Sequence, residues 1–112
     1  MTDKSWKALE RRIAESLGTV RTPLSGGSSR HTTSDTLHPS LYVECKLRKA
    51  SAVHTLFQEV TLEARKEAKI PVVVIHLSNT PHSVAVIDWS FFCTLWTAFT
   101  AQQETNNDSN DR

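Results

Sequence analysis

The 112-residue sequence has only two cysteines, three glycines and one methionine, and it has no long apolar run. Cys45 and Cys93 alone make no disulfide framework of the kind that holds small secreted domains together. No apolar stretch approaches the roughly 20 residues that span a bilayer. The N-terminus carries charges where a signal peptide has its apolar core. These absences favour a soluble protein of a reducing, cytoplasmic compartment with no membrane partner.

A large net charge is also missing, since the formal charge is +1. The charge is unevenly distributed, however. Residues 1–69 contain 12 Lys and Arg against 8 Asp and Glu, whereas residues 70–112 contain 1 against 4. A basic front half permits a polyanionic partner such as nucleic acid without proving one. With 38% hydrophobic residues, the chain is too apolar for a disordered protein and can form one modest core.

Apolar periodicity predicts helices and strands in alternation, which is typical of a layered α/β domain. Helices are predicted over residues 4–17, 51–69 and 89–99, and strands over residues 19–22, 41–47, 71–77 and 83–87. Residues 41–47 alternate apolar and polar side chains, while the continuous Val/Ile run of 71–77 predicts a strand covered on both faces. The sequence therefore predicts one domain over residues 1–100 and a disordered, Asn- and Gln-rich tail over residues 101–112.

Three carboxylates and one lysine in the front half are candidates for chemistry. Glu44 and Lys46 lie two apart on a predicted strand and project from the same face, with Cys45 directed towards the core. Asp35 precedes Glu44 by nine residues, so neighbouring strands would bring the two together. Carboxylates that close repel unless a cation lies between them, and oxygen ligands suit Mg²⁺ or Mn²⁺. Glu10 flanks the apolar stripe of the first helix, where a carboxylate needs a partner.

Each of these residues also has a plainer interpretation. A Glu-X-Lys pair is often only a surface ion pair, and Asp35 could begin a turn. Glu10 could pair with Lys7 or Arg30.

Other kinds of site find less support in the sequence. The possible zinc ligands are His31, His38, Cys45 and His54, and their spacing matches no compact ligand pair. The Gly/Ser-rich loop of residues 25–34 lacks the Lys-Ser/Thr ending of a nucleotide phosphate loop, so no nucleotide cofactor is expected. No nucleophile elbow surrounds Ser25, and no helix-turn-helix or zinc finger is present to read bases.

Taken in order, the carboxylates and their neighbours resemble the PD-(D/E)XK nuclease superfamily, and within it the archaeal-type and phage Holliday junction resolvases. The resemblance covers about residues 5–77. It lies in the patterns of residues 8–12, 21–26, 34–35 and 42–46 and in Gln58. Ser34 stands where the family has a proline, and the spacing from Asp35 to Glu44 is short. The resemblance implies a restriction-endonuclease-like central mixed β-sheet flanked by helices.

The resemblance also implies a Mg²⁺-dependent endodeoxyribonuclease, with Mn²⁺ as a substitute, that leaves 5′-phosphate ends. The implied metal ligands are Glu10, Asp35, Glu44 and the backbone carbonyl of Cys45. Lys46 would position the attacking water, and Ser25 would contact the scissile phosphate. The implied DNA-binding residues are Arg11, Arg12, Arg30, Arg48, Lys49 and Gln58.

The expected substrate is a four-way DNA junction, because an enzyme without a base-reading element should recognise DNA shape. Symmetric cleavage of two strands requires two active sites and therefore a homodimer. The aromatic segment 89–99 fits core and subunit contacts better than DNA stacking. Two alternatives stay open: a nuclease of homing, flap or restriction type, and a DNA-binding protein of the same fold that does not cut.

Overall fold

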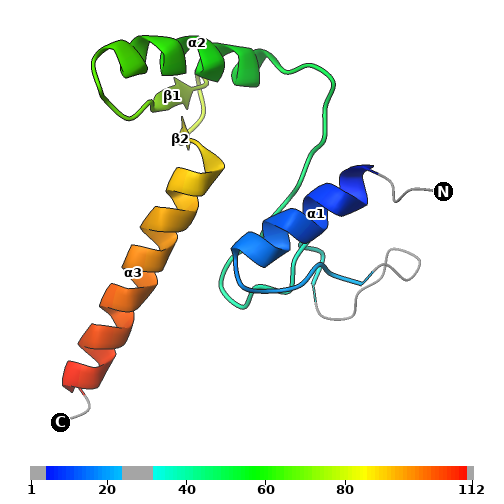
Figure 1. Ribbon diagram of the computed structural model, residues 1–112, viewed down its shortest axis with the longest axis vertical. Coiled ribbons are helices and arrows are strands. Elements are labelled where there is room, and N and C mark those ends of the chain that lie inside the picture. Colours follow the sequence, from blue (N-terminus) through cyan, green and yellow to red (C-terminus); the bar gives the residue numbers. More distant parts are fainter. Residues whose placement is uncertain (1–4, 24–31, 111–112) are drawn as a thin grey trace. The chain divides into compact units, whose positions relative to one another are not determined.

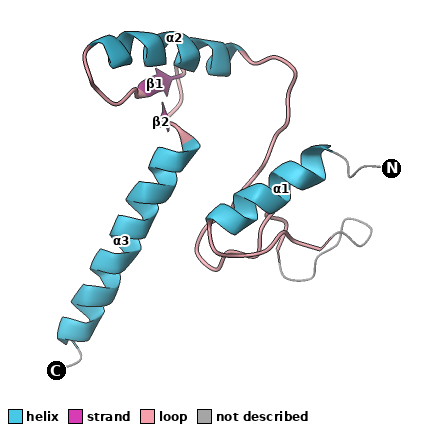
Figure 2. Ribbon diagram, viewed as in Figure 1, coloured by secondary structure: helices cyan, strands magenta, loops and turns pink. Residues whose placement is uncertain are grey.

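The computed structural model describes residues 5–23 and 32–110, and the chain divides into two compact units, Met1–Lys49 and Ala50–Arg112 (Figure 1). The described elements are α1 (Ser5–Ser16), α2 (Ala52–Lys66), β1 (Val73–His76), β2 (Ser83–Val86) and α3 (Trp89–Asn110) (Figure 2). The predicted mixed α/β class is confirmed. The sheet of the described residues has two antiparallel strands, so the larger central sheet stays a prediction.

In the first unit, α1 ends close to where the sequence predicts. Ala14 is fully buried, and Gly18 adopts φ 70°, the left-handed conformation that favours glycine after a helix. The chain then runs beside residues 35–37. Arg21 forms an isolated antiparallel bridge with Thr36, and the N–H of Leu37 donates to the carbonyl of Val20 at 3.0 Å. The predicted strand of residues 19–22 is therefore reduced to one bridge.

The predicted strand over residues 41–47 is wrong in its pairing, because this extended segment joins no ladder of the described residues. Its alternation is correct up to Lys46: Leu41, Val43 and Cys45 are half-buried, and Tyr42, Glu44 and Lys46 are exposed, but Leu47 is 50% exposed. A serine side chain takes the place of two ladder hydrogen bonds. Ser34 Oγ accepts the N–H of Val43 at 2.8 Å and donates to its carbonyl at 3.1 Å. Alternation of apolar and polar residues predicts which side chains face the interior, but it does not predict the hydrogen-bond partners of the backbone.

Ser34→Ala is expected to destabilise the protein by about 1–3 kcal/mol, because the N–H of Val43 loses its partner. Ser34 is 4% exposed, so water cannot replace the hydroxyl. Urea unfolding measures the change in the free energy of unfolding. Ser40→Ala is the matched control at an exposed serine, and equal stability of the two variants would contradict the prediction.

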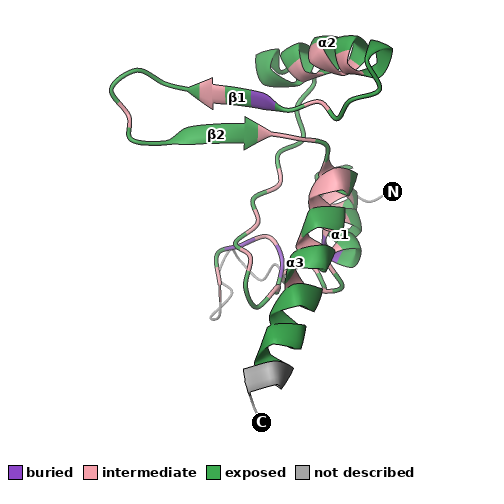
Figure 3. Cartoon of the chain, turned by 90° about the vertical axis from the view of Figure 1, so that its left-hand side faces the viewer, coloured by how far each residue is buried: buried purple, intermediate pink, exposed green. Residues whose placement is uncertain are grey.

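In the second unit, α2 begins as predicted at Ser51, whose side chain accepts the N–H of His54 at 3.2 Å. The predicted hairpin is also confirmed, with Val73 opposite Val86 and His76 opposite Ser83. The expectation that both faces of the first strand are covered is wrong for the described chain (Figure 3). Val73 is buried, but Val74 is 65% exposed, because a continuous apolar run does not by itself supply a covering element.

The last helix, α3, runs to Asn110 and includes residues for which the sequence predicted a disordered tail. Helix propagation costs little once a helix has formed, and Ala, Gln and Glu in this stretch are good helix formers. Trp89, Phe92, Trp96 and Phe99 form a row along α3, with successive ring centroids 5.1, 6.4 and 5.5 Å apart.

Among the described residues, no helix is both long and apolar enough to cross a membrane.

Candidate functional site

The first carboxylate of the predicted site, Glu10, is held by Arg21. Arg21 Nε lies 2.7 Å from Glu10 Oε1, and the two side chains are only 14% and 12% exposed. The guanidinium also lies 5.5 Å from the ring centroid of Trp6. Glu10 therefore has a part-buried cationic partner in Arg21, which the sequence did not suggest, while the suggested Arg30 lies outside the described residues. Arg21 opens one of the patterns that carry the family resemblance, but nothing in that pattern links it to Glu10.

Asp35 binds the backbone of the segment that carries Glu44. The N–H of Cys45 donates to Asp35 Oδ2 at 2.6 Å, and the N–H of Asp35 donates to the carbonyl of Val43 at 2.8 Å. These two contacts fix residues 34–35 beside residues 43–45. Asp35 and Glu44 are thus brought into one neighbourhood, as the sequence argument requires.

Glu44 and Lys46 form an ion pair on the exposed side of the same segment. Lys46 Nζ lies 2.9 Å from Glu44 Oε1, and the side chains are 59% and 49% exposed. An ion pair this exposed contributes little to stability, with a typical value of about 0–1 kcal/mol. Both side chains are therefore accessible to a ligand, and exchanging this contact for another would cost little free energy.

Burial and the negative charges of all three carboxylates raise the pKa of the Cys45 thiol. Its pKa is raised from 9.0 to about 11, first by burial and then by the negative charges of Asp35, Glu10 and Glu44. The negative charges of the three carboxylates that the sequence singled out as metal ligands therefore all disfavour the thiolate of Cys45.

Alkylation of Cys45 is expected to be slow, because only the thiolate reacts. With a pKa of about 11 rather than 9.0, Cys45 should react at pH 8 about a hundredfold more slowly than an ordinary thiol. Asp35→Asn removes one negative charge and should speed the reaction, although burial will keep it slow. The measurement is the iodoacetamide rate against pH in a Cys93→Ser background. A rate at pH 8 equal to that of a free cysteine would contradict the prediction.

The carboxylates fit a divalent cation by their chemistry, while their side chains are engaged with other partners. Carboxylates supply the oxygen donors and the negative charge that Mg²⁺ prefers. Within residues 5–23 and 32–110, however, no three His, Cys, Asp or Glu side chains are arranged as a ligand set. Glu10 and Glu44 each contact a basic side chain, and Asp35 contacts an N–H. Metal binding would require these contacts to rearrange.

The remaining predicted residues are spread along the chain. Arg11 and Arg12 are exposed on α1, and Arg48 and Lys49 are exposed after the candidate site in the same unit. Gln58 belongs to α2 in the second unit. Ser25 and Arg30 lie outside the described residues. The structure therefore brings together Glu10, Asp35, Glu44, Cys45 and Lys46, and it adds Arg21 to them.

No protein-family model, no curated protein and no solved structure matches this chain. The resemblance to the nuclease superfamily accordingly stays a prediction from the residues quoted above.

Proposed function

We propose that this chain is a metal-dependent, structure-specific endodeoxyribonuclease of the PD-(D/E)XK type, with a four-way DNA junction as its substrate. The observation that carries the proposal is that Asp35 Oδ2 accepts the N–H of Cys45 at 2.6 Å, directly beside Glu44, which contacts Lys46 at 2.9 Å.

The residues of this site divide into metal ligands and groups that contact the DNA phosphate. Glu10, Asp35, Glu44 and the Cys45 carbonyl would hold Mg²⁺, or Mn²⁺ in its place. When bound, the ion supplies an activated water and stabilises negative charge on the phosphate. Lys46 is more than half exposed, so its ammonium can donate to a phosphate oxygen or position the water.

The proposal also includes the type of sheet, the cellular location of the protein and the residues that bind DNA. The expected fold is a restriction-endonuclease-like sheet in a cytoplasmic enzyme, and the alternation of residues 41–47 and the β1–β2 hairpin, each within its own unit, are consistent with strands of such a fold. Exposed Arg11, Arg12, Arg48 and Lys49 supply positive charge in the unit that holds the site. Phosphate contacts of this kind make DNA affinity fall steeply as salt rises.

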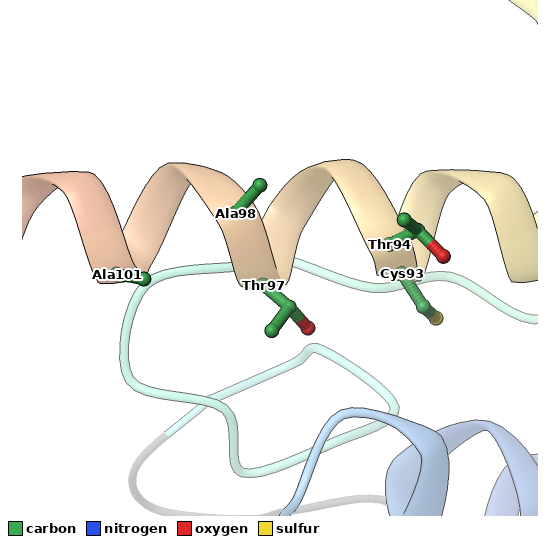
Figure 4. A pocket seen from close by; sticks show the side chains of 5 residues that line it. All are labelled: Cys93, Thr94, Thr97, Ala98 and Ala101. Carbon is green, nitrogen blue, oxygen red and sulfur yellow. The ribbon is translucent and has the colours of Figure 1, made fainter.

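A homodimer belongs to the proposal because two strands must be cut symmetrically. We assign the contact to α3, where Cys93, Thr97 and Ala101 lie four residues apart along one side (Figure 4). Their small side chains line a groove of about 430 Å³ that leaves room for a second helix. Residues 89–103 carry no charge, so two copies of this stretch meet without repulsion.

Thr97→Arg is expected to convert the dimer into a monomer, because a guanidinium would fill the groove and bring two like charges together. Gel filtration with light scattering at micromolar concentration measures the mass. Gln103→Arg adds the same charge on the opposite side of α3 and should leave the dimer intact. A wild-type protein that is already monomeric, or a dimer that withstands Thr97→Arg, would contradict this assignment.

One observation favours a second candidate, a DNA-binding protein that does not cut. Glu10 and Glu44 are each paired with a basic side chain, Arg21 and Lys46. These pairs offset the carboxylate charge without any metal. Such a protein would use its exposed arginines for DNA and its carboxylates for folding.

Cleavage of labelled DNA separates the two candidates. A four-way junction is compared with linear duplex, a Y-fork and single strand, each with Mg²⁺, Mn²⁺ or EDTA. Paired symmetric nicks in the junction alone, lost with EDTA, would support the proposal. Metal-dependent cutting of duplex or flaps would keep the site but replace the substrate. A junction that is bound and left uncut with either metal would favour the second candidate.

A further inference from the structure

A groove in the second unit is lined by chemistry that the proposed nuclease does not use. Its volume is about 500 Å³, within the range of small-ligand sites. Its lining includes His54, Phe57, Gln58, Thr61 and Arg65 of α2, together with Asp88, which directly precedes α3. Only Gln58 among them has a role in the resemblance to nucleases.

The polar side chains of the groove follow one face of α2. Residues 54, 58, 61 and 65 are separated by four, three and four positions, which places them in one row along a helix. The side chains of His54, Gln58 and Arg65 make no hydrogen bond or ion pair with the described part of the chain. Their donors and acceptors are therefore available to a ligand.

The groove holds one cation and one anion that do not neutralise each other. Arg65 and Asp88 both line it, yet no ion pair joins them among the described residues. Asp88 accepts hydrogen bonds from the backbone and the hydroxyl of Ser90, which lower the pKa of its carboxyl and keep it ionised. A phosphate would suit Arg65 but would be repelled by Asp88. The lining instead fits a neutral ligand that has hydrogen-bond acceptors on one edge, for Arg65, and hydrogen-bond donors on the adjacent edge, for Asp88.

We propose that this groove binds a guanine base. The O6 and N7 acceptors of guanine match the two parallel N–H donors of Arg65, and the adjacent N1–H and N2–H donors match the carboxylate of Asp88. Phe57 offers an aromatic face on which the base can stack. Adenine carries an amino group in place of O6 and so loses an acceptor for arginine. This inference does not depend on the nuclease proposal, because it concerns other residues and another unit.

The first test is calorimetric titration of the full chain with dGMP, dAMP, dCMP and TMP. Binding of dGMP is expected to be about tenfold tighter than that of the others, the discrimination that one bidentate pair provides. Equal binding of the four nucleotides, no binding of dGMP, or competition by inorganic phosphate as strong as by dGMP would each overturn the proposal.

Substitutions of the groove residues test whether dGMP binds in this groove. Arg65→Gln and Asp88→Asn should each weaken dGMP binding about tenfold, the value of one lost bidentate pair. Asparagine still caps a helix N-terminus, so Asp88→Asn preserves the start of α3. Lys66→Gln makes the same charge change at an exposed neighbour that is paired with Glu63, and it should leave the affinity unchanged. A loss with Lys66→Gln as large as with Arg65→Gln would overturn the proposal.

A second arm identifies the source of the base. An all-thymine single strand is compared with the same strand carrying one central guanine. If the strand with one guanine binds more tightly than both the all-thymine strand and dGMP, the natural ligand is an unpaired base of a strand. If it binds more tightly than the all-thymine strand but no more tightly than dGMP, the natural ligand is a free nucleotide. The absence of any gain from the guanine would contradict base recognition in both forms.

Discussion

Glu44→Gln is expected to lower the Mg²⁺-dependent cleavage rate of a four-way junction by about a thousandfold, a loss typical of removing one electrostatic element of a catalytic site. Glutamine keeps the volume of the side chain and one acceptor oxygen but removes the charge that a divalent cation requires. Junction binding should persist or strengthen, because one negative charge is removed from the surface that meets the phosphates. Single-turnover cleavage and a gel-shift titration measure the two effects separately.

Stability should change little in this variant, which makes the loss of cleavage interpretable. The ion pair between Glu44 and Lys46 is about half exposed, so breaking it costs at most about 1 kcal/mol. Glu59→Gln on α2 is the matched control, with the same chemical change at an exposed position. Undiminished cleavage by Glu44→Gln, or an equal loss in Glu59→Gln, would remove Glu44 from the active site.

The elements of the second unit follow closely from the sequence because their signals are local. Ser51 caps α2 through a hydrogen bond within one turn, and the register of β1 and β2 is set by the short turn between them. The end of α3 was harder to predict, since the polar composition of residues 101–110 is typical of a tail and of an exposed helix alike. Composition alone does not separate these two states.

The first unit depends on contacts between distant residues, and its pairing could not be predicted. Alternation in residues 41–47 gave the correct face for Cys45 and Glu44 but not the partner of the backbone. The backbone partners are the hydroxyl of Ser34 and the backbone and carboxylate of Asp35. Ser34 stands where the resembled family has a proline, so the residue that departs from the family pattern makes two of the contacts that hold Asp35 against the 41–47 segment.

The candidate site was predictable in its carboxylates and not in its cation. Glu10, Asp35 and Glu44 stood out because their spacing matched a known order, and the charges of all three act on the thiol of Cys45. Arg21 carried no charge pattern that linked it to Glu10, because eleven residues and a change of direction separate them. Only the fold brings this pair together, with the arginine also beside Trp6.

The part-buried pair of Glu10 and Arg21 leads to the largest expected effect on stability. Arg21→Gln should lower the free energy of unfolding by about 3 kcal/mol, because it leaves a carboxylate that is only 12% exposed without its cation. Such a loss is a large fraction of the total stability of a small protein. Urea unfolding followed by circular dichroism measures it. Lys66→Gln breaks an exposed ion pair and should cost less than about 1 kcal/mol.

The double variant Glu10→Gln/Arg21→Gln decides whether burial of an unpaired charge is the cause. Two amides can share a hydrogen bond without any ionic group, so the double variant should recover most of the stability that Arg21→Gln loses. If the two substitutions instead add, the loss comes from packing of the guanidinium against Trp6 and not from the charge of Glu10. The recovered double variant should still fail to cleave, because Glu10 would have lost the charge that a metal ligand needs.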